Sequence, residues 1–505
     1  MLSFIECDIL LVDNRNRVNG FLHFYEICLE PPSCPLDFHD GHGAVRTRTF
    51  FLHPPDSPAS VGLASMNAAL PVCFSIILLF SHALSGSATA AEGALRASAS
   101  RADITPDPHM LNWAGKKTYE TVLDPLFVRV LVLDEGTNRV AILSWDLVDA
   151  SEQSVARVRT TISQSTGIPK AHILINASHS HSAPFSSKYG TRMLEEEHTD
   201  VDAVEQDPIY QKWAAELPER CVQAVSQANS TLREATFSIS RANVPEVLFN
   251  RRPRKPDGTV ETIFEPADPV TLPNGLQFGP VNSMLSVLSM RDGKGGTIAT
   301  LFHLPCHSVS IYSYYQGVSA DWSGPVATRI AAASGGEAMF LQGCAGDIVP
   351  ARRGVQARDS MSRLVADRAL TAAKKGLVLE AGHLRVSHAS LGLPLTEKAS
   401  RELGTDTVQS EVQVITFGTL ALVALPGEPL TDVGTAIQQR SPFPHTLVLG
   451  YSNGEGVRYV GMPGEKRRGG YEMGVSAAGT DECGLLLVET AVRLLKEHQT
   501  KSANP

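Results

Sequence analysis

An apolar run that ends in two histidines is the feature that most constrains this chain. Residues 172–177 read His-Ile-Leu-Ile-Asn-Ala, a pattern typical of a buried strand, and small residues then flank His179 and His181 until Pro184 ends the extended segment. Side chains two residues apart in an extended backbone point to the same side. Both imidazoles can therefore face one pocket, which suits a metal ligand beside a proton-transfer group.

The composition is that of a globular protein without a nucleic-acid partner. The 505 residues are enough for a large core or for more than one domain. A hydrophobic fraction of 43% and a charged fraction of 19% are ordinary, and the formal net charge is −9. A mildly acidic chain without a basic stripe lacks the electrostatic footprint of nucleic-acid binding. The sequence indicates no protein partner either.

The N-terminal part differs from the remainder. Residues 1–65 lack a sustained hydrophobic period, and we interpret them as a non-native or disordered extension. Residues 66–90 begin at Met66, contain an apolar stretch at 72–80 and continue into small residues, which is the pattern of a secretory signal peptide. We therefore expect translation to start at Met66 and the protein to be exported, to a periplasm or out of the cell. The open alternative is that this apolar stretch is a membrane anchor.

Predicted strands and helices alternate in the rest of the chain. The order of strand, helix and strand that leads to His179 indicates an α/β fold with functional groups at strand ends. We expect one large catalytic domain over residues 95–498, with mixed β-sheets inside and helices outside. The expected elements include strands at 126–133, 140–144, 284–290, 297–302, 412–417 and 420–425, and helices at 151–164, 210–229 and 480–497.

Two further strand exits carry possible metal ligands. The strand at 297–302 leads to His303 and His307, and Pro305 between them argues against a regular helix, so we expect one histidine to serve a site and the other to pack. The strand at 420–425 leads to Glu428, which prolines and a glycine hold in place. Together with His179, these residues offer two imidazoles and a carboxylate, a common catalytic zinc set.

A serine hydrolase is the competing interpretation. Residues 450–454 read Gly-Tyr-Ser-Asn-Gly and match the G-x-S-x-G pattern around Ser452, and Asp481 and His498 follow in the order of a catalytic triad. A nucleophile elbow needs a helix directly after the serine, and the residues after Ser452 do not predict one. A non-catalytic binding protein on the same scaffold is a third possibility.

Several motifs in register resemble the neutral/alkaline, non-lysosomal ceramidase family. Their order and spacing match that family from about Ala97 to Tyr471. The motifs are Ser-His-Ser-His-Ser-Ala-Pro at 178–184, Cys306-His307, Ser-Ala-Asp at 319–321, Gln-Gly-Cys-Ala-Gly-Asp at 342–347, Leu-Pro-Gly-Glu at 425–428, and the pair Tyr459 and Tyr471.

The resemblance implies a zinc-dependent amidohydrolase of sphingolipid metabolism. The implied reaction is hydrolysis of an N-acyl amide, N-acylsphingosine to a sphingoid base and a fatty acid, with a lipid-like substrate that can lie at a membrane surface. The resemblance further implies a Zn²⁺ ion held by His179, His307, Glu428 and Tyr459, with His181, Tyr471 and Arg251 as proton-transfer and oxyanion-binding residues.

Two departures from the family pattern concern the substrate more than the metal. Val349 stands where the family has a serine, and Ala183 stands where it has a glycine. A different N-acyl or ester compound therefore competes with ceramide as the substrate. The sequence also leaves open whether Cys306 and Cys344 form a disulfide.

Overall fold

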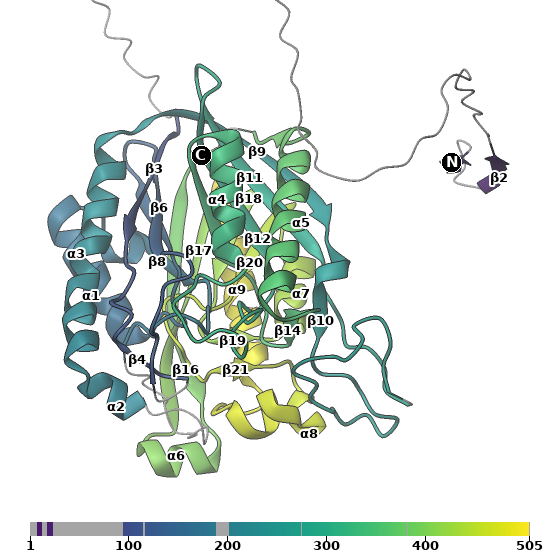
Figure 1. Cartoon of the computed structure of the whole chain (residues 1–505). Helices are drawn as coiled ribbons and strands as arrows, with labels where there is room; N and C mark the ends of the chain where they lie inside the picture. The colour runs from purple at the N-terminus through teal and green to yellow at the C-terminus, as the bar shows by residue number, and fades with distance from the viewer. Residues whose placement is uncertain are drawn as a thin grey trace, which may run out of the picture. The chain divides into compact units, whose positions relative to one another are not determined.

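The computed structural model describes residues 8–12, 18–23, 94–114, 117–187, 201–273, 275–380 and 382–503 (Figure 1). The chain divides into two units, Met1–Leu84 and Ser85–Pro505. In the first unit, β1 (Asp8–Val12) pairs antiparallel with β2 (Val18–His23). The expected signal segment 66–90 lies outside the described residues, so the expectations for residues 1–65 and 66–90 stay predictions.

The second unit is built on a nine-stranded mixed sheet. Its strand order is β13-β12-β11-β9-β3-β6-β7-β8, with β15 paired to β9. The parallel pairs β7–β8 and β12–β13 are each connected through a helix, α1 (Glu152–Thr166) and α4 (Ser323–Ser334), as parallel neighbours require. The strands are β3 (Arg96–Asp103), β6 (Phe127–Asp134), β7 (Arg139–Trp145), β8 (Ile173–Ala177), β9 (Arg233–Asn243), β11 (Met284–Asp292), β12 (Thr297–Leu304), β13 (Glu337–Gln342) and β15 (Leu377–Val378).

A smaller sheet packs against one face of the larger one. Its order is β16-β17-β18-β20, with β18 and β20 parallel. The strands are β16 (Arg385–Pro394), β17 (Thr407–Phe417), β18 (Leu420–Ala424) and β20 (His445–Leu449). Three short pairs of the second unit lie outside both sheets: β4 (Leu111–Asn112) with β5 (Lys117–Thr118), β10 (Leu248–Asn250) with β14 (Ile348–Pro350), and β19 (Glu428–Pro429) with β21 (Tyr459–Val460).

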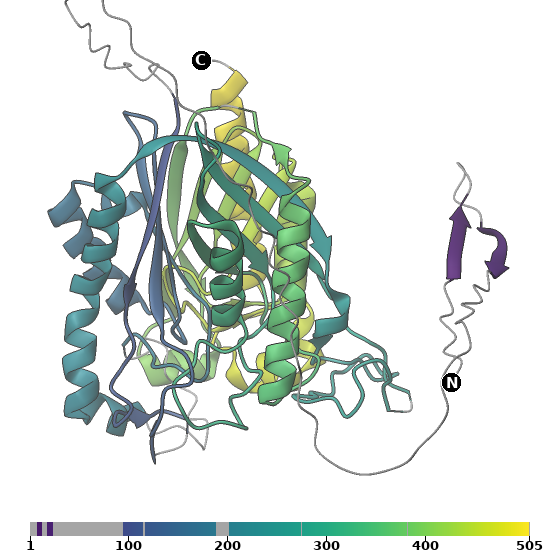
Figure 2. The same cartoon turned by 45° about the horizontal axis from the view of Figure 1, so that its top comes forward.

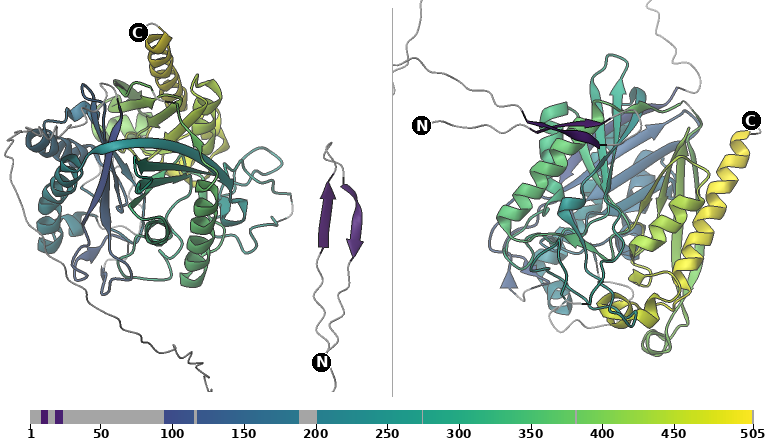
Figure 3. Two further views of the ribbon diagram at one scale, coloured as in Figure 1. Left: turned by 90° about the horizontal axis from the view of Figure 1, so that it is seen from above. Right: turned by 90° about the vertical axis from the view of Figure 1, so that its right-hand side faces the viewer.

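The second unit has four layers in the order helices, large sheet, small sheet, helices. Alternate side chains of the large sheet face the layers on its two sides. In β6, Val130 packs toward α1 and α3 (Pro208–Ser230), whereas its neighbour Leu131 packs toward the small sheet with Ile415 and Leu422. Over the other half of the large sheet lie α4 and α5 (Val355–Ala373), and the outer face of the small sheet is covered by α7 (Thr431–Arg440) and α9 (Cys483–Ala503) (Figures 2 and 3). The expected α/β architecture, with sheets inside and helices outside, is confirmed.

Shorter helical segments complete the second unit. They are η1 (Lys170–His172), α2 (Val201–Gln206), η2 (Pro245–Val247), α6 (Glu397–Leu403), α8 (Glu465–Arg468) and the π-helical turn η3 (Tyr471–Ser476). Within the described residues, no helix combines the length and the apolar character needed to span a membrane.

Candidate metal centre

Two histidines are brought together by loops that leave β8 and β12. His179 lies two residues after β8 with a positive φ of 61°, and its backbone N–H donates to the carbonyl of Leu147. His307 lies three residues after β12, and its backbone N–H donates to the carbonyl of Ile348. A bridge between Ser180 and Ser308 aligns the two loops, so the strand ends deliver both rings to one place.

The histidine cluster has the dimensions of a metal site. The ligand atoms of His179, His181 and His307 all lie within 4.8 Å of one another, and the Nε2 atoms of His179 and His181 are 3.0 Å apart. His179 and His307 are buried, whereas His181 is partly exposed. This group can hold a metal ion.

Glu428 adds a carboxylate to the cluster. Its Oε2 atom lies 3.4 Å from Nε2 of His179 and 3.2 Å from Nε2 of His307. Burial alone would raise the pKa of Glu428, but the facing His179 and His307 hold it well below its usual value. Glu428 is therefore an anion that points at two imidazole nitrogens inside the protein.

Backbone carbonyls fix which nitrogen of each imidazole carries the proton. His179 Nδ1 lies 2.6 Å from the carbonyl oxygen of Val148, and His307 Nδ1 lies 2.7 Å from that of Ala345. A carbonyl only accepts, so each Nδ1 must donate and each neutral ring turns an Nε2 lone pair toward Glu428. Two lone pairs and a carboxylate repel one another unless a cation lies among them. His307 Nε2 also has no hydrogen-bond partner.

The pairing of β19 with β21 places Tyr459 opposite Glu428 in parallel register. The Tyr459 hydroxyl accepts a hydrogen bond of 2.9 Å from Nη2 of Arg251. Burial, and then the charge of Glu428, raise the pKa of Tyr459 well above its usual value, although Arg251 opposes this. A phenol at this position lies next to the cluster and within reach of a guanidinium.

Arg251 is buried and held by three acceptors. Its Nε donates to Glu472 at 2.6 Å, and its Nη2 donates to the carbonyl of Gly346 at 2.9 Å as well as to Tyr459. Burial alone would lower the pKa of Arg251, but Tyr459 and Glu472 hold it above its usual value. The Tyr471 ring lies 5.9 Å from the Tyr459 ring, and the Arg251 guanidinium lies 5.7 Å from the Tyr471 ring centroid. Arg251 and Tyr471 thus line the same space.

Aromatic rings surround His181 on its partly exposed side. Its ring lies 5.3 Å from Trp113 and 5.2 Å from Tyr312, and both contacts are edge-on. Burial, and then the neighbouring His179 and His307, lower the pKa of His181 well below its usual value. His181 is therefore a neutral base at pH 7.

Asp347 ties together the backbone behind the cluster. It accepts from the backbone N–H and the hydroxyl of Thr431 at 2.8 Å each, and from the amide of Asn250 at 2.8 Å. It thereby joins the loop after β13 to β10 and to the start of α7.

Val349, at the position where the sequence motif departs from the ceramidase pattern, is buried in β14 opposite Phe249. Val349 packs with Phe249, Val309 and Ala351 in a small apolar cluster.

Several residues considered from sequence lie elsewhere. His303, the other histidine of the segment 303–307, is buried in β12, and its Nε2 contacts the carbonyl of Val448 at 3.1 Å. Ser452 is buried, donates to the carbonyl of Gly450 at 2.8 Å, and no helix follows it.

The other two members of the possible triad have their own partners. The Asp481 carboxylate accepts backbone N–H groups of α8 and the residue before it, and His498 Nδ1 lies 2.9 Å from the Thr416 hydroxyl. The hydrogen bonds of these residues therefore link Ser452 to neither of them. The cysteines of the described chain, Cys221, Cys306, Cys344 and Cys483, are buried and free.

Sequence reasoning missed four residues of the site. Tyr451 donates to Glu428 at 3.3 Å, and its ring lies 4.4 Å from that of His179; its place just beyond β20 is the same strand-exit signal that pointed to the histidines. Glu472 follows Tyr471 directly, and a buried partner for Arg251 could have been sought there. Trp113 and Tyr312 lie in irregular segments that offer no periodic signal.

Comparisons with known proteins give a fold and no sequence relative. No protein-family model and no curated protein matches the chain. Among solved structures, the chain is similar to neutral ceramidase from Pseudomonas aeruginosa, with a TM-score of 0.62 and 17% identity over 80% of this chain and 75% of the other. It is also similar to a ceramidase complexed with C2, with a TM-score of 0.64 and 16% identity over 80% and 76% of the two chains. The second unit of this chain therefore has the fold of neutral ceramidase.

Proposed function

We propose that this protein is a zinc-dependent hydrolase of N-acyl amide bonds with a ceramide-like substrate, N-acylsphingosine. The observation that carries the proposal is the buried Glu428 carboxylate facing the Nε2 lone pairs of His179 and His307 at 3.2–3.4 Å. The similarity in fold to structures titled as ceramidases supports the choice of reaction.

The donor set fits a zinc ion. Zinc takes imidazole nitrogen and carboxylate oxygen, and its histidine ligands commonly donate their other N–H to a carbonyl, as His179 and His307 do here. We assign His179, His307, Glu428 and Tyr459 as ligands. When bound, zinc lowers the pKa of a water molecule to about 7 and polarises a carbonyl group.

His181 is proposed as the proton-transfer group. Its neutral ring can accept the proton of the attacking water and later donate it to the leaving amine. His179 and His307 are fixed through Nδ1 by backbone carbonyls, whereas no backbone carbonyl of the described residues fixes Nδ1 of His181. His181 is also the histidine of the cluster that reaches solvent. These properties suit a base better than a ligand.

Arg251 and Tyr471 are proposed to stabilise the oxyanion of the tetrahedral intermediate. The guanidinium is fixed by Glu472 and Gly346 before any substrate arrives, so little reorganisation accompanies the development of charge. Trp113, Tyr312 and the exposed Phe264 supply apolar surface around these groups, which suits an acyl chain.

The test combines metal analysis with turnover. We expect the purified protein to contain one zinc per chain, to lose hydrolysis of N-acylsphingosine on treatment with a chelator, and to regain it with zinc. His179→Ala should bind no zinc and be inactive. Zinc binding without turnover of any N-acyl or ester lipid would leave only a binding protein, and full activity after chelation would rule out the proposed mechanism.

We also propose that the protein is exported through the segment at 66–90. N-terminal sequencing of the protein recovered from an expressing cell is expected to start near residue 91. Recovery of the intact N-terminus in the cytoplasm would contradict export without affecting the proposed chemistry.

A further inference from the structure

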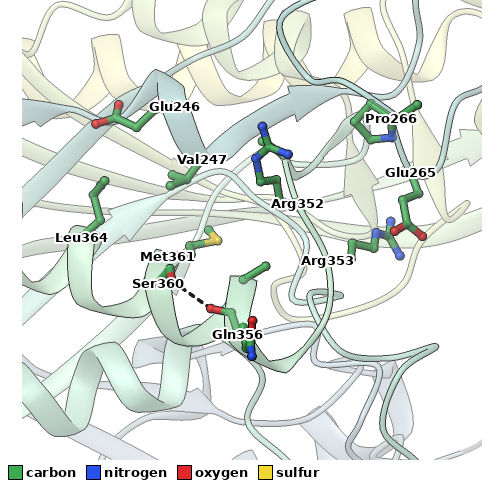
Figure 4. A pocket seen from close by; sticks show the side chains of 13 residues that line it. Glu246, Val247, Glu265, Pro266, Arg352, Arg353, Gln356, Ser360, Met361 and Leu364 are labelled. Carbon is green, nitrogen blue, oxygen red and sulfur yellow. Dashed lines mark hydrogen bonds between the residues drawn. The ribbon is translucent and has the colours of Figure 1, made fainter.

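A cavity lies next to the segment that borders the metal centre. Its volume is about 860 Å³, within the range of about 300–1,000 Å³ typical of small-molecule sites. The cavity lies between the start of α5, the residues after β14 and the segment 265–267 (Figure 4). None of the proposed metal ligands lines it.

One part of the cavity is apolar. Val247, Met361 and Leu364 line it, and Met361 is buried. Figure 4 shows Val247 and Leu364 toward one end, with Arg353 and Glu265 toward the other. The cavity thus has an apolar end, at which the Glu246 carboxylate also lies, and a charged end with Arg353 and Glu265.

The arginines of the cavity are poorly compensated. Arg353 donates from Nη2 to the carbonyl of Phe264 at 2.6 Å, but its buried Nε has no hydrogen-bond partner. Burial, and then the nearby Arg251, lower the pKa of Arg353. Arg352 is exposed and has no hydrogen bond or ion pair within the described part of the chain. The exposed guanidinium of Arg352 is therefore open to an anion in the cavity.

The two acids that line the cavity have partners of their own. Glu246 forms an ion pair of 3.1 Å with Arg368 of α5, and Glu265 accepts a hydrogen bond from the hydroxyl of Tyr314. The ion pair balances the charge of Glu246, whereas Glu265 keeps its negative charge and acts to raise the pKa of Arg353. Two arginines thus face one carboxylate that has no other cationic partner among the described residues. Positive charge therefore remains available at one end of the cavity.

We propose that this cavity binds a long-chain carboxylate, with its head group at Arg352 and Arg353 and its alkyl chain over Val247, Met361 and Leu364. The choice of a carboxylate over other anions rests on the proposed function, because hydrolysis of an N-acyl amide releases one. Guanidinium groups bind carboxylates through charge-assisted hydrogen bonds, and an alkyl chain gains from contact with the apolar end.

Phe264 and Glu265 connect the two sites. The Phe264 ring lies 5.2 Å from the Tyr471 ring and 5.5 Å from the Arg251 guanidinium, so it borders the metal centre. The next residue, Glu265, lines the cavity. A fatty acid held by Arg353 therefore lies one residue away from the wall of the catalytic site.

The test measures binding and not hydrolysis, so it is independent of the proposed activity. Decanoate is titrated into the full-length, metal-free protein by calorimetry, with decan-1-ol and acetate as probes of the chain alone and the charge alone. We expect decanoate to bind roughly tenfold or more tightly than either probe. The double variant Arg352→Gln/Arg353→Gln should lose this preference, because both head-group donors are gone.

Arg363→Gln is the matched control, since Arg363 is an exposed arginine of α5 that does not line the cavity. It should bind decanoate as the wild type does. If the double variant does not fold, two other measurements test the proposal. The single variant Arg352→Glu, at an exposed position, should bind decanoate more weakly. The methyl NMR signal of Met361 should shift with decanoate and not with acetate. Equal affinity for decanoate and decan-1-ol, or binding unaffected in both arginine variants, would overturn the proposal.

Discussion

The Glu428 carboxylate lies 3.2 Å from Nε2 of His307, although neither atom has a proton to share when the ring is neutral and the acid is ionised. Both residues are buried, and His307 Nδ1 is committed to the carbonyl of Ala345. The contact is favourable only when a cation or an extra proton lies between the two groups. This relationship leads to the first prediction.

Glu428→Gln should bind zinc more weakly than the wild type. Loss of a residue that only hydrogen-bonds to a metal ligand costs about 10–100-fold in affinity, and we expect a larger loss here because the variant removes a charged ligand itself. The measurement is a competition titration against a chromophoric chelator. Glu489→Gln, which removes an exposed carboxylate paired with Arg440, should leave zinc affinity unchanged. Equal affinities for the two variants would exclude Glu428 as a ligand.

Gly346→Ala should weaken zinc binding without unfolding the protein. A Cβ atom at Gly346 would lie 2.5 Å from the backbone oxygen of Glu428, so the segment that carries the carboxylate must shift. We expect a loss of roughly 10–100-fold in zinc affinity by the same titration. Gly293→Ala is the control, because its Cβ would meet nothing within 4 Å. Unchanged affinity in Gly346→Ala would mean that this loop does not position Glu428.

Glu472→Gln should lower the free energy of unfolding by about 3–5 kcal/mol, the range for breaking a buried ion pair by removing one partner. Glu472 is fully buried and accepts from Arg251 at 2.6 Å and from Arg252 at 2.7 Å. Urea unfolding measures the change. Activity should fall further than stability explains, since Arg251 loses the contact that orients it. A stable and fully active variant would contradict the positioning role.

His303 predicts a stability that falls in acid. Burial lowers the pKa of His303 from 6.5 to about 4, so between these values the unfolded state binds a proton that the folded state does not. This contribution is complete above pH 6.5 and is lost as the pH falls toward 4, up to about 3 kcal/mol. The free energy of unfolding of His303→Gln should therefore fall less than that of the wild type as the pH is lowered from 6.5 to 4. Parallel pH profiles for the wild type and His303→Gln would show that His303 titrates alike in both states.

Ser452→Ala should retain hydrolytic activity. The Ser452 hydroxyl bonds to the carbonyl of Gly450 and accepts from the Asn176 amide at 3.0 Å, so the substitution removes structural contacts only. We expect kcat/KM within about twofold of the wild type and a modest loss of stability, about 1 kcal/mol. Loss of turnover in a folded Ser452→Ala protein would favour the serine esterase mechanism over the zinc-dependent one.

Local sequence patterns predicted several helices and strands of the fold. The helix expected at 151–164 is α1. Ser151 caps its start by accepting from the Ser154 N–H, and Gly167 is its C-cap with a φ of 73°. The strand expected at 420–425 is β18. By contrast, β9 has few buried residues and no strict alternation, and nothing before α7 announces a helix, so both escaped prediction.

Strand exits indicated the site residues because the carboxyl ends of neighbouring strands meet in space. What the sequence could not give is the convergence of two different sheets. Glu428 follows a strand of the small sheet, whereas His179 and His307 follow strands of the large one. Contacts between sheets leave no periodic pattern in either segment. Strand exits could therefore suggest His179, His307 and Glu428 as one set, but they could not show that the three residues meet.

The carbonyls that hold His179 and His307 have one more consequence. Both rings are immobilised when the chain folds, so the conformational entropy of ordering them is lost then and not when an ion arrives. Removal of the ion should leave both rings in place, and reloading should proceed on the time scale of diffusion and ligand exchange, without a refolding phase.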